Sequence, residues 1–333
     1  MLKKIFNPVM FIAVFFFIIS FETLANDKKV IYLISSSSAY NESSISNIIK
    51  TLQNKGYDVK TKYLNHQISD FGYVDIDKER AKNLIKALTD DNVKYLWFVR
   101  GGAGALNLIP YLQDNIGKIK NSKEKIVIGF SDVTAIHYFL NNYVGWKSIH
   151  GIVAAYNKDI YNDNMKEAIS MNNDFDQVFN AIEKGVSYNG LIPLNAQAKS
   201  GVTGVLGGGN LTLIQAFFST EYEKYSPNQI LLMEDTGDTY RQLDRILNQI
   251  EYKKQFAPKA IVFGQFYSLT ASDEERLIYK TVIKEFANKT NIPVYYYPYF
   301  GHGKTNNPFI LEQKAIIHCE KNEDYCQLNQ AGI

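Results

Sequence analysis

The chain has 333 residues, a formal net charge of +2, 46% hydrophobic residues and 21% charged residues. This composition is typical of a globular protein and excludes a largely disordered one. The chain is longer than an ordinary domain with a single hydrophobic core, and its length suits two domains that share an interface. A net charge so close to zero, without a zinc-finger, RNP or basic-helix pattern, argues against nucleic acid as a partner.

The first 25 residues differ in composition from the rest. Lys3 and Lys4 form a basic start, residues 5–21 carry no charge, and Thr23 and Ala25 supply the small residues of a signal-peptidase site. We therefore expect residues 1–25 to be a signal peptide, cleaved after about Ala25, and the mature chain to be periplasmic. A retained membrane anchor is the alternative. No cysteine stands at the cleavage site, which argues against a lipoprotein.

Residues 26–160 alternate between short β-rich runs and helical patterns. This alternation predicts βαβ units on a mostly parallel sheet, and so a first α/β domain. Strands are predicted at 30–34, 59–63, 95–99 and 125–130, and helices before Gly56, at 77–89 and at about 133–142.

The pattern weakens over residues 161–198, where we predict one helix at 175–184 and interpret the segment as the connection between domains. Alternation resumes over residues 199–333, which predicts a second α/β domain. Its strands are expected at 202–206, 230–233, 260–264 and 293–297, and one of its helices begins with a capping box at Ser272.

Ser131 stands at a junction where a predicted buried strand runs directly into a helix. This is the context of a nucleophile elbow, which exposes a hydroxyl and directs helix N–H groups at developing negative charge. The G-x-S-x-G pattern is incomplete, because Val133 replaces the second glycine. A helix N-cap is the alternative role for Ser131.

The loop Arg100-Gly101-Gly102-Ala103-Gly104 follows another predicted strand. Glycines there allow close approach of the backbone to a ligand, and their N–H groups can form an oxyanion hole. A simple tight turn or a phosphate site are the alternatives. The loop lacks the Gly-Lys-Ser/Thr of a P-loop, which disfavours nucleotide binding.

Two further residues complete a catalytic hypothesis. Glu234 ends a predicted strand, where α/β proteins place catalytic groups. His302 lies between two glycines in a loop, whereas His137 falls in a helix and His318 in a strand. His302 is therefore the best candidate for a general base. The order Ser, Glu, His along the chain is that of α/β-hydrolases.

Six short segments, in this order, resemble the LD-carboxypeptidase (muramoyltetrapeptide carboxypeptidase) family of serine peptidases. They are Arg100-Gly101-Gly102, Gly129-Phe130-Ser131-Asp132, Ile149-His150-Gly151, Gly208-Gly209-Asn210-Leu211, Glu234-Asp235 and Gly301-His302-Gly303. Each segment alone is weak evidence for the resemblance, whereas all six in this order are specific for the family. The chain departs from the family at Ala103, where an aromatic residue is usual, and at the serine run after the first strand; these departures concern substrate preference.

The resemblance implies a flavodoxin-like doubly wound N-terminal domain, a C-terminal α/β domain and an active site between them. It implies Ser131 as the nucleophile, His302 as the base and Glu234 as the group that orients the base. The implied oxyanion and substrate contacts come from the backbone of Gly102 and Asp132 and from Gly209 and Asn210. No metal or organic cofactor is implied.

The implied substrate is a murein tetrapeptide, which loses its terminal D-Ala by hydrolysis of an L,D-peptide bond. Two other functions stay open: a family peptidase acting on a peptide–nucleotide antibiotic of the microcin C type, and a non-catalytic murein-peptide-binding protein. The oligomeric state also stays open, with a homodimer as one option.

Cys319 and Cys326 are the only cysteines. In an exported protein such a pair can form a disulfide. No C-x-x-C or H-E-x-x-H spacing supports a zinc site.

Overall fold

The computed structural model describes residues 29–160, 173–321 and 323–333. The predicted signal peptide at residues 1–25 lies outside these ranges, as do residues 161–172 of the predicted connection. Within the described ranges, no helix combines the length and the hydropathy that crossing a bilayer requires.

The helices and strands follow one another in this order: β1 (Val30–Ile34), α1 (Glu42–Asn54), β2 (Asp58–Tyr63), α2 (Asp77–Thr89), β3 (Tyr95–Phe98), α3 (Ile109–Asp114), α4 (Ile116–Lys120), β4 (Ile126–Gly129), α5 (Thr134–Phe139), β5 (Ser148–His150), α6 (Phe175–Lys184), β6 (Val186–Pro193), β7 (Val202–Asn210), α7 (Leu211–Ala216), β8 (Gln229–Glu234), α8 (Tyr240–Tyr252), β9 (Ala260–Phe263), α9 (Asp273–Lys289), β10 (Val294–Tyr296), β11 (Phe309–Leu311), β12 (Lys314–Cys319) and β13 (Cys326–Gln330).

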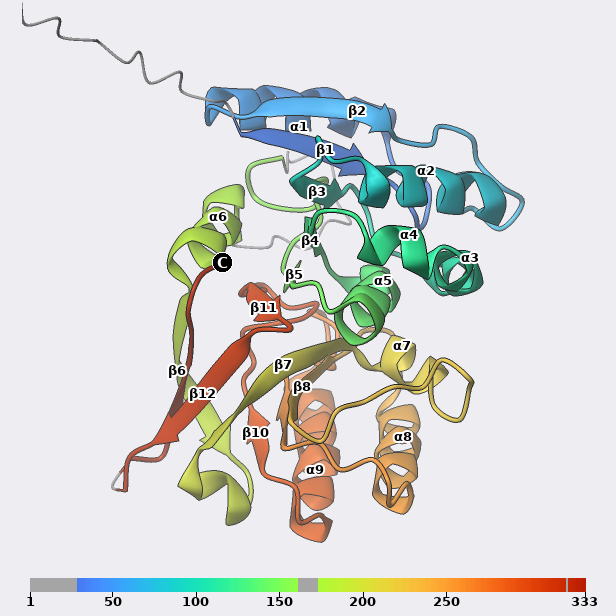
Figure 1. Cartoon of the computed structure of the whole chain (residues 1–333). Helices are drawn as coiled ribbons and strands as arrows, with labels where there is room; N and C mark the ends of the chain where they lie inside the picture. Colours follow the sequence, from blue (N-terminus) through green and yellow to red (C-terminus); the bar gives the residue numbers. More distant parts are fainter. Residues whose placement is uncertain (1–28, 161–172, 322) are drawn as a thin grey trace, which may run out of the picture.

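The N-terminal part is a six-stranded sheet between two layers of helices (Figure 1). Its strand order is β11-β5-β4-β3-β1-β2, and β1 to β5 are parallel. The order 2-1-3-4-5 is that of flavodoxin-like folds, as expected. One apolar cluster joins the sheet to α1 and α6, and another joins its opposite face to α2, α3, α4 and α5.

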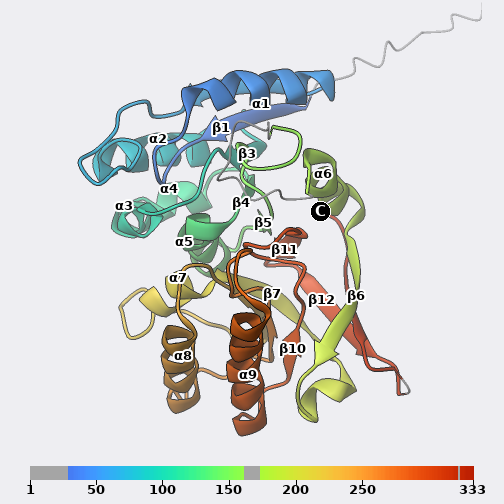
Figure 2. The ribbon, with the colours of Figure 1, turned by 180° about the vertical axis from the view of Figure 1, so that it is seen from behind.

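The C-terminal part is a closed barrel in the order β10-β6-β13-β12-β7-β8-β9. Strands β7, β8, β9 and β10 are parallel neighbours, and antiparallel strands complete the ring. Helices α8 and α9 lie side by side outside the parallel strands (Figure 2). Their amphipathic sequences place one apolar face against β8, β9 and β10.

The predicted strand and helix types are confirmed, and α2 and α6 have the predicted bounds. The structure adds four strands that the sequence pattern did not predict, namely β5, β6, β11 and β13. Strand β6 lies inside the predicted connection, where its exposed and buried residues do not alternate cleanly. Strand β11 has only three residues and pairs with β5, so the chain returns from the barrel to the N-terminal sheet.

Two predicted elements differ in extent. Strand β7 continues through three glycines to Asn210, because its pairing with β8 persists to the register pair Asn210–Glu234. The helix predicted at about 133–142 is divided into a short 3₁₀ turn at Ser131–Val133, the α-helix α5 and a π-helical turn at Leu140–Val144. Gly145 ends this run with a φ of +84°.

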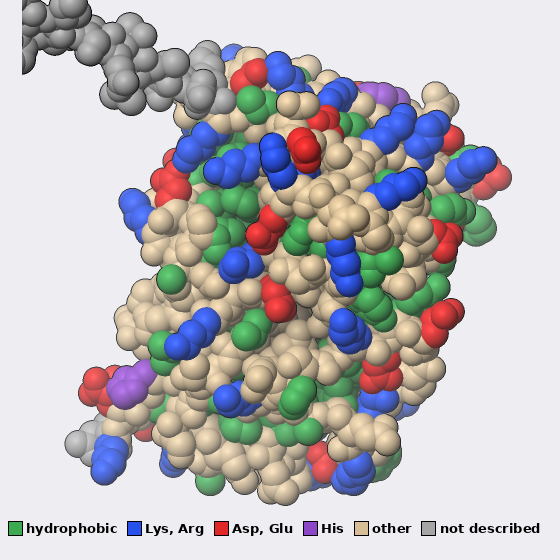
Figure 3. Space-filling view, viewed as in Figure 1, with side chains coloured by type: hydrophobic (Ala, Val, Ile, Leu, Met, Phe, Trp, Pro, Cys, Tyr) green, Lys and Arg blue, Asp and Glu red, His purple; other side chains and the backbone are tan. Residues whose placement is uncertain are grey.

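Charged side chains of both signs are interspersed over the face seen in Figure 3. No large field of one sign is visible there, in line with the net charge of +2.

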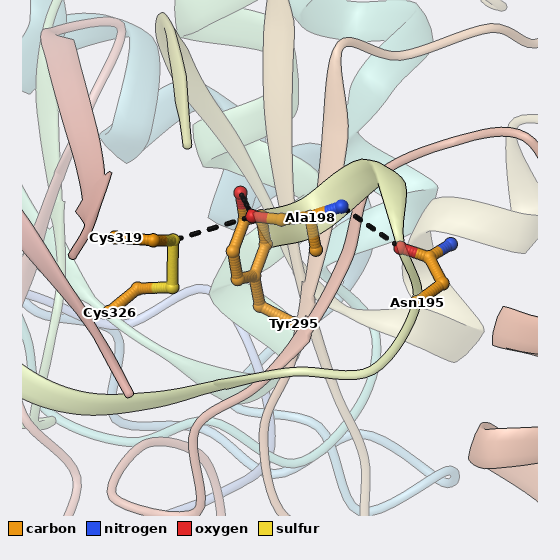
Figure 4. The surroundings of a disulfide bond; sticks show 5 residues. All are labelled: Asn195, Ala198, Tyr295, Cys319 and Cys326. Atoms are coloured by element: carbon orange, nitrogen blue, oxygen red, sulfur yellow. Dashed lines mark hydrogen bonds between the residues drawn. A yellow bond between two sulfur atoms is a disulfide. The ribbon is translucent and has the colours of Figure 1, made fainter. Parts of the chain in front are cut away.

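Cys319 and Cys326 form a disulfide between strands β12 and β13 (Figure 4). The two residues are directly opposite in the antiparallel register. The Sγ of Cys319 lies 3.3 Å from the carbonyl oxygen of Ala198, which also accepts a 2.7 Å hydrogen bond from the hydroxyl of Tyr295. The disulfide therefore closes the β12–β13 hairpin, and the sulfur of Cys319 packs against the segment that precedes β7.

Candidate active site

Ser131 lies in a sharp turn between β4 and α5. Its backbone φ is +64°, in the left-handed region, and holding a residue with a Cβ there costs about 1–3 kcal/mol. Gly129 makes the turn possible, because a Cβ on it would lie 2.8 Å from Cγ1 of Val133. Val133 can therefore replace the second glycine of the elbow. The N-cap of the 3₁₀ turn is Phe130, so Ser131 is not the cap.

The loop of residues 100–104 packs directly against this turn. A Cβ on Gly101 would lie 3.0 Å from Cβ of Ser131, so a larger residue would push the loop from the elbow. The Oδ2 of Asp132 accepts a 2.9 Å hydrogen bond from the N–H of Ala105. Burial raises the pKa of Asp132, and the hydrogen bond from Ala105 opposes that shift.

Gly102 has a φ of +108°, and a Cβ on it would lie 2.2 Å from Oγ of Ser38. The same Oγ accepts a hydrogen bond of 3.1 Å from the N–H of Ala103. The predicted oxyanion donors, the N–H groups of Gly102 and Asp132, thus belong to two loops that meet at Ser131. Their role stays a prediction.

The structure brings the three predicted catalytic side chains together. Nε2 of His302 lies 3.1 Å from Oγ of Ser131, and its Nδ1 lies 2.6 Å from Oε2 of Glu234. Both are hydrogen-bond distances. The Glu234 carboxylate accepts from Nδ1–H, which leaves Nε2 to accept the hydroxyl proton. Glu234 is fully buried, whereas the His302 side chain keeps 12% of its surface exposed.

The two glycines beside His302 are required by close contacts. Gly301 has a φ of +97°, and a Cβ there would lie 2.7 Å from Oε2 of Glu234. A Cβ on Gly303 would lie 2.5 Å from Oε1 of Gln265. The Gly-His-Gly pattern therefore reflects the approach of this loop to the ends of β8 and β9.

Asn306 was not identified from the sequence, although it holds this loop. It is fully buried, its Oδ1 accepts a 2.8 Å hydrogen bond from the N–H of Gly301, and its Nδ2 donates at 2.7 Å to the carbonyl of Gly151. The sequence contains no signal for it, since an asparagine in a polar loop is ordinary.

The charges of Glu234 and His302 support each other. Burial by itself lowers the pKa of His302, but the charge of Glu234 and the hydrogen bond to it outweigh burial, so the pKa is raised. Burial likewise acts to raise the pKa of Glu234, and the attraction of His302 outweighs it, so the pKa is lowered. The carboxylate is therefore ionised beside the ring.

Gly209 and Asn210 lie at the end of β7, close to the catalytic side chains. The Oδ1 of Asn210 caps α7 by accepting from the N–H of Leu213, and its Nδ2 donates at 2.9 Å to Asp235. A Cβ on Gly209 would lie 2.5 Å from Oγ1 of Thr134. Both residues thus hold the site together, and the substrate contact implied for them stays a prediction.

Asp235 is buried and accepts hydrogen bonds from Asn210 and Thr212. Burial and the charge of Glu234 raise its pKa to about 6, while these bonds oppose the shift. It connects the end of β8 to the start of α7.

The remaining histidines have different surroundings. His137 is buried in α5, His318 lies on β12, and His66 pairs with Glu42 at the surface. His150 is also fully buried, with its Nε2 4.0 Å from Oε1 of Glu234. Among the described residues, no cluster of His, Cys, Asp or Glu has the arrangement of a metal site.

The arrangement can perform nucleophilic acyl transfer. A hydroxyl in a half-buried elbow contacts a base, and a buried carboxylate fixes the tautomer of that base. The predicted oxyanion donors belong to the elbow and to the loop that packs against it, and such N–H groups can stabilise a tetrahedral intermediate.

Comparisons with known proteins find matches to both parts of the chain. The model of the LD-carboxypeptidase N-terminal domain matches residues 31–151, and that of the LD-carboxypeptidase C-terminal domain matches residues 203–317. The protein "Putative carboxypeptidase RP402" of Rickettsia prowazekii is 34% identical over 254 residues, which cover 75% of each chain. The murein tetrapeptide carboxypeptidase of Pseudomonas aeruginosa is 25% identical over 72% of this chain and 77% of its own.

Solved structures share the fold. The muramoyltetrapeptide carboxypeptidase from Oxalobacter formigenes superimposes with a TM-score of 0.74 at 21% identity, over 91% of this chain and 99% of that one. The microcin C7 self immunity protein MccF, in its inactive mutant apo state, gives 0.72 at 17% identity, over 92% and 96%. The two matched domain models together cover more than half of the chain, and the protein therefore belongs to the LD-carboxypeptidase family of serine-type peptidases.

Proposed function

We propose that this carboxypeptidase releases the terminal D-Ala from murein tetrapeptides by hydrolysing an L,D-peptide bond, with Ser131, His302 and Glu234 as its catalytic residues. The observation that carries the proposal is the pair of contacts from His302, at 3.1 Å to Ser131 and at 2.6 Å to Glu234. The similarity to a murein tetrapeptide carboxypeptidase supports the choice of substrate.

The proposed mechanism has two steps. Oγ of Ser131 attacks the carbonyl carbon of the scissile bond while Nε2 of His302 takes the hydroxyl proton. The tetrahedral intermediate collapses when His302 returns this proton to the leaving amine, and D-Ala departs. Water, deprotonated by the same Nε2, then attacks the acyl-enzyme, and His302 returns this proton to Oγ of Ser131 as the tripeptide is released. Glu234 stabilises the imidazolium in both steps.

Arg100 is our candidate for binding the terminal carboxylate of the substrate. It directly precedes Gly101, which touches Ser131, and its guanidinium lies 5.6 Å from the ring of Tyr156 and donates to the carbonyl of Ala39. Within the described part of the chain, Arg100 has no carboxylate partner. A half-buried arginine without an anion suits a ligand that brings one.

Export is the second part of the proposal. The basic start, the uncharged run and the small residues Thr23 and Ala25 support a cleaved signal peptide, and the Cys319–Cys326 disulfide suits an oxidising compartment. Murein lies in the same compartment. N-terminal sequencing of the envelope protein is expected to begin at about Asn26, and an uncleaved chain in the cytosol would contradict export.

The substrate is tested by incubating the chain from residue 26 with tetrapeptide muropeptides. Mass spectrometry is expected to show the loss of one alanine, and Ser131→Ala is the inactive control. A peptide–nucleotide antibiotic of the microcin C type is assayed in parallel. If that compound is cleaved and the muropeptide is not, the murein proposal is wrong although the catalytic residues stand.

The carboxylate-binding role is tested with Arg100→Met, and Arg241→Met is its matched control. Arg241 likewise lies over a tyrosine ring, that of Tyr240, at 4.8 Å. Loss of a charge-assisted hydrogen bond of about 1.5–3 kcal/mol is expected to raise KM about 10- to 150-fold. A substrate amidated at its C-terminus is expected to be cleaved equally by the wild type and the Arg100 variant. An equal loss on both substrates would contradict the role.

A further inference from the structure

One oxygen of the catalytic carboxylate lacks a hydrogen-bond donor. Oε2 of Glu234 accepts from His302, whereas Oε1 is buried and has no partner among the described residues. A buried charged oxygen without a donor typically costs more than about 1–3 kcal/mol, and a carboxylate held through one oxygen can rotate. The orientation of His302 depends on this carboxylate, so a second donor would matter.

His150 is the polar side chain that faces this oxygen. It is fully buried at the end of β5, and both of its ring nitrogens lack partners among the described residues. Its Nε2 lies 4.0 Å from Oε1 of Glu234. Two unsatisfied groups thus face each other, about 1 Å beyond hydrogen-bond distance.

Packing holds the His150 ring at this place. The rings of Phe130 and Phe300 meet it edge-to-face, with centroids 5.9 Å and 6.1 Å away. A Cβ on Gly209 would lie 3.3 Å from Cδ2 of His150, so this side is also closed. The ring is therefore fixed, and a small rotation of the Glu234 carboxylate would bring its Oε1 towards Nε2 of His150.

His150 is expected to be neutral at pH 7, and a neutral imidazole has one N–H that it can donate to Glu234. Burial lowers its pKa to about 4, although the charge of Glu234 opposes that shift; His302 acts in the same direction as burial. The ring is therefore neutral at pH 7 and carries its single proton on one nitrogen. The charge of Glu234 favours that proton on Nε2, which faces it.

We propose that His150 is a positioning residue, whose Nε2–H donates to Oε1 of Glu234 and so fixes the carboxylate that orients His302. This inference rests on the catalytic roles in the proposed function, but not on the identity of the substrate. His150 is not the base itself, because it has no exposed surface and His302 already contacts Ser131.

The test compares replacements that differ only in the donor. His150→Phe keeps a ring of similar size without an N–H, and kcat is expected to fall about 100-fold with KM within twofold, since a misplaced catalytic group costs about this much. His150→Gln places an amide N–H near the position of Nε2 and is expected to recover most of kcat. His150→Asn, whose amide is one bond shorter, is expected not to recover it.

Asn141→Leu is the matched structural control. Asn141 is also buried, and it bonds to Ser148 on the same strand, β5. Its replacement is expected to lower Tm while kcat stays within about twofold. Thermal unfolding of all variants separates lost stability from lost positioning.

The rate at which a fluorophosphonate labels Ser131 is measured beside peptide hydrolysis. This rate reports activation of the serine without any murein peptide. If the wild type is labelled but cleaves no muropeptide, the substrate proposal fails and the labelling rates still decide the role of His150. The role is refuted if His150→Phe is labelled within twofold of the wild-type rate, or if the Gln variant is no faster than the Asn variant. Should the Phe variant fail to fold, the Gln and Asn variants decide alone.

Discussion

Replacement of Glu234 by glutamine tests the charge in the proposed triad with almost no change in shape. The carboxylate is fully buried and 2.6 Å from Nδ1 of His302. A glutamine amide that donates to Nδ1 would force the proton onto Nε2, and that nitrogen could then no longer accept from Ser131. Loss of the orienting carboxylate in a triad typically costs about 10⁴-fold in kcat, or about 5.4 kcal/mol of transition-state stabilisation.

The same variant has a predicted pH dependence. Burial lowers the pKa of His302, but the charge of Glu234 and the hydrogen bond to it together outweigh burial and raise the pKa above its ordinary value of 6.5. The base works only when it is neutral, so kcat/KM of the wild type is expected to fall about tenfold per pH unit below that raised pKa. In Glu234→Gln burial, which lowers the pKa of His302, is opposed only by the weaker influence of Asp235, so this acidic limb is expected to move to lower pH than in the wild type.

The assay is a kcat/KM profile on the tetrapeptide from pH 5 to 9, with Glu312→Gln as a control. Glu312 is a half-buried carboxyl group whose burial raises its pKa, and its replacement is expected to leave the profile unchanged. A loss below tenfold, or an acidic limb at the same pH in both enzymes, would refute the role of Glu234.

The remaining predictions concern the turn at Ser131, the loop that carries His302 and the hairpin of β12 and β13. Ser131→Ala is expected to leave only a residual rate of hydrolysis, about 10³–10⁴-fold above the uncatalysed rate in water, with an unchanged Tm. Turnover near that of the wild type would contradict the role of Ser131 as nucleophile. Gly301→Ala is expected to lower kcat more than tenfold, because its Cβ would meet Glu234, whereas Gly56→Ala, with a φ of +88° and open space around it, affects only stability; equal kinetics of the two variants contradict this. Reduction of the Cys319–Cys326 bond, which closes an eight-residue loop, is expected to lower the free energy of unfolding by roughly 2.5 kcal/mol in urea titrations; two reactive thiols in the unreduced protein contradict the bond.

The local elements and the catalytic candidates could be predicted because their signals lie within short segments. A buried run that ends in Gly-Phe-Ser-Asp predicts a strand, a turn and a helix, and His302 between two glycines predicts a loop. The order of such segments along the chain then indicated the family.

The return of β11 to the N-terminal sheet and the surroundings of the carboxylate could not be predicted in this way. Strand β11 has three residues, and nothing in Phe309–Leu311 indicates that its partner is β5 in the other sheet. Likewise, His150 and Glu234 are 84 positions apart, and periodicity carries no information about contacts at such a separation. These features depend on tertiary pairing, which overrides local preference.

The pairing of β11 has a consequence for catalysis. His302 lies on the chain between β10, which belongs to the barrel, and β11, which pairs with β5 through the register pair Phe309–His150. Ser131 follows β4, the neighbour of β5 in the same sheet. The base is therefore tied at one side to the sheet of the nucleophile and at the other to the barrel that carries Glu234. The hydrogen bonds between β11 and β5, together with those of Asn306 to Gly301 and Gly151, thus help to keep His302 near both Ser131 and Glu234.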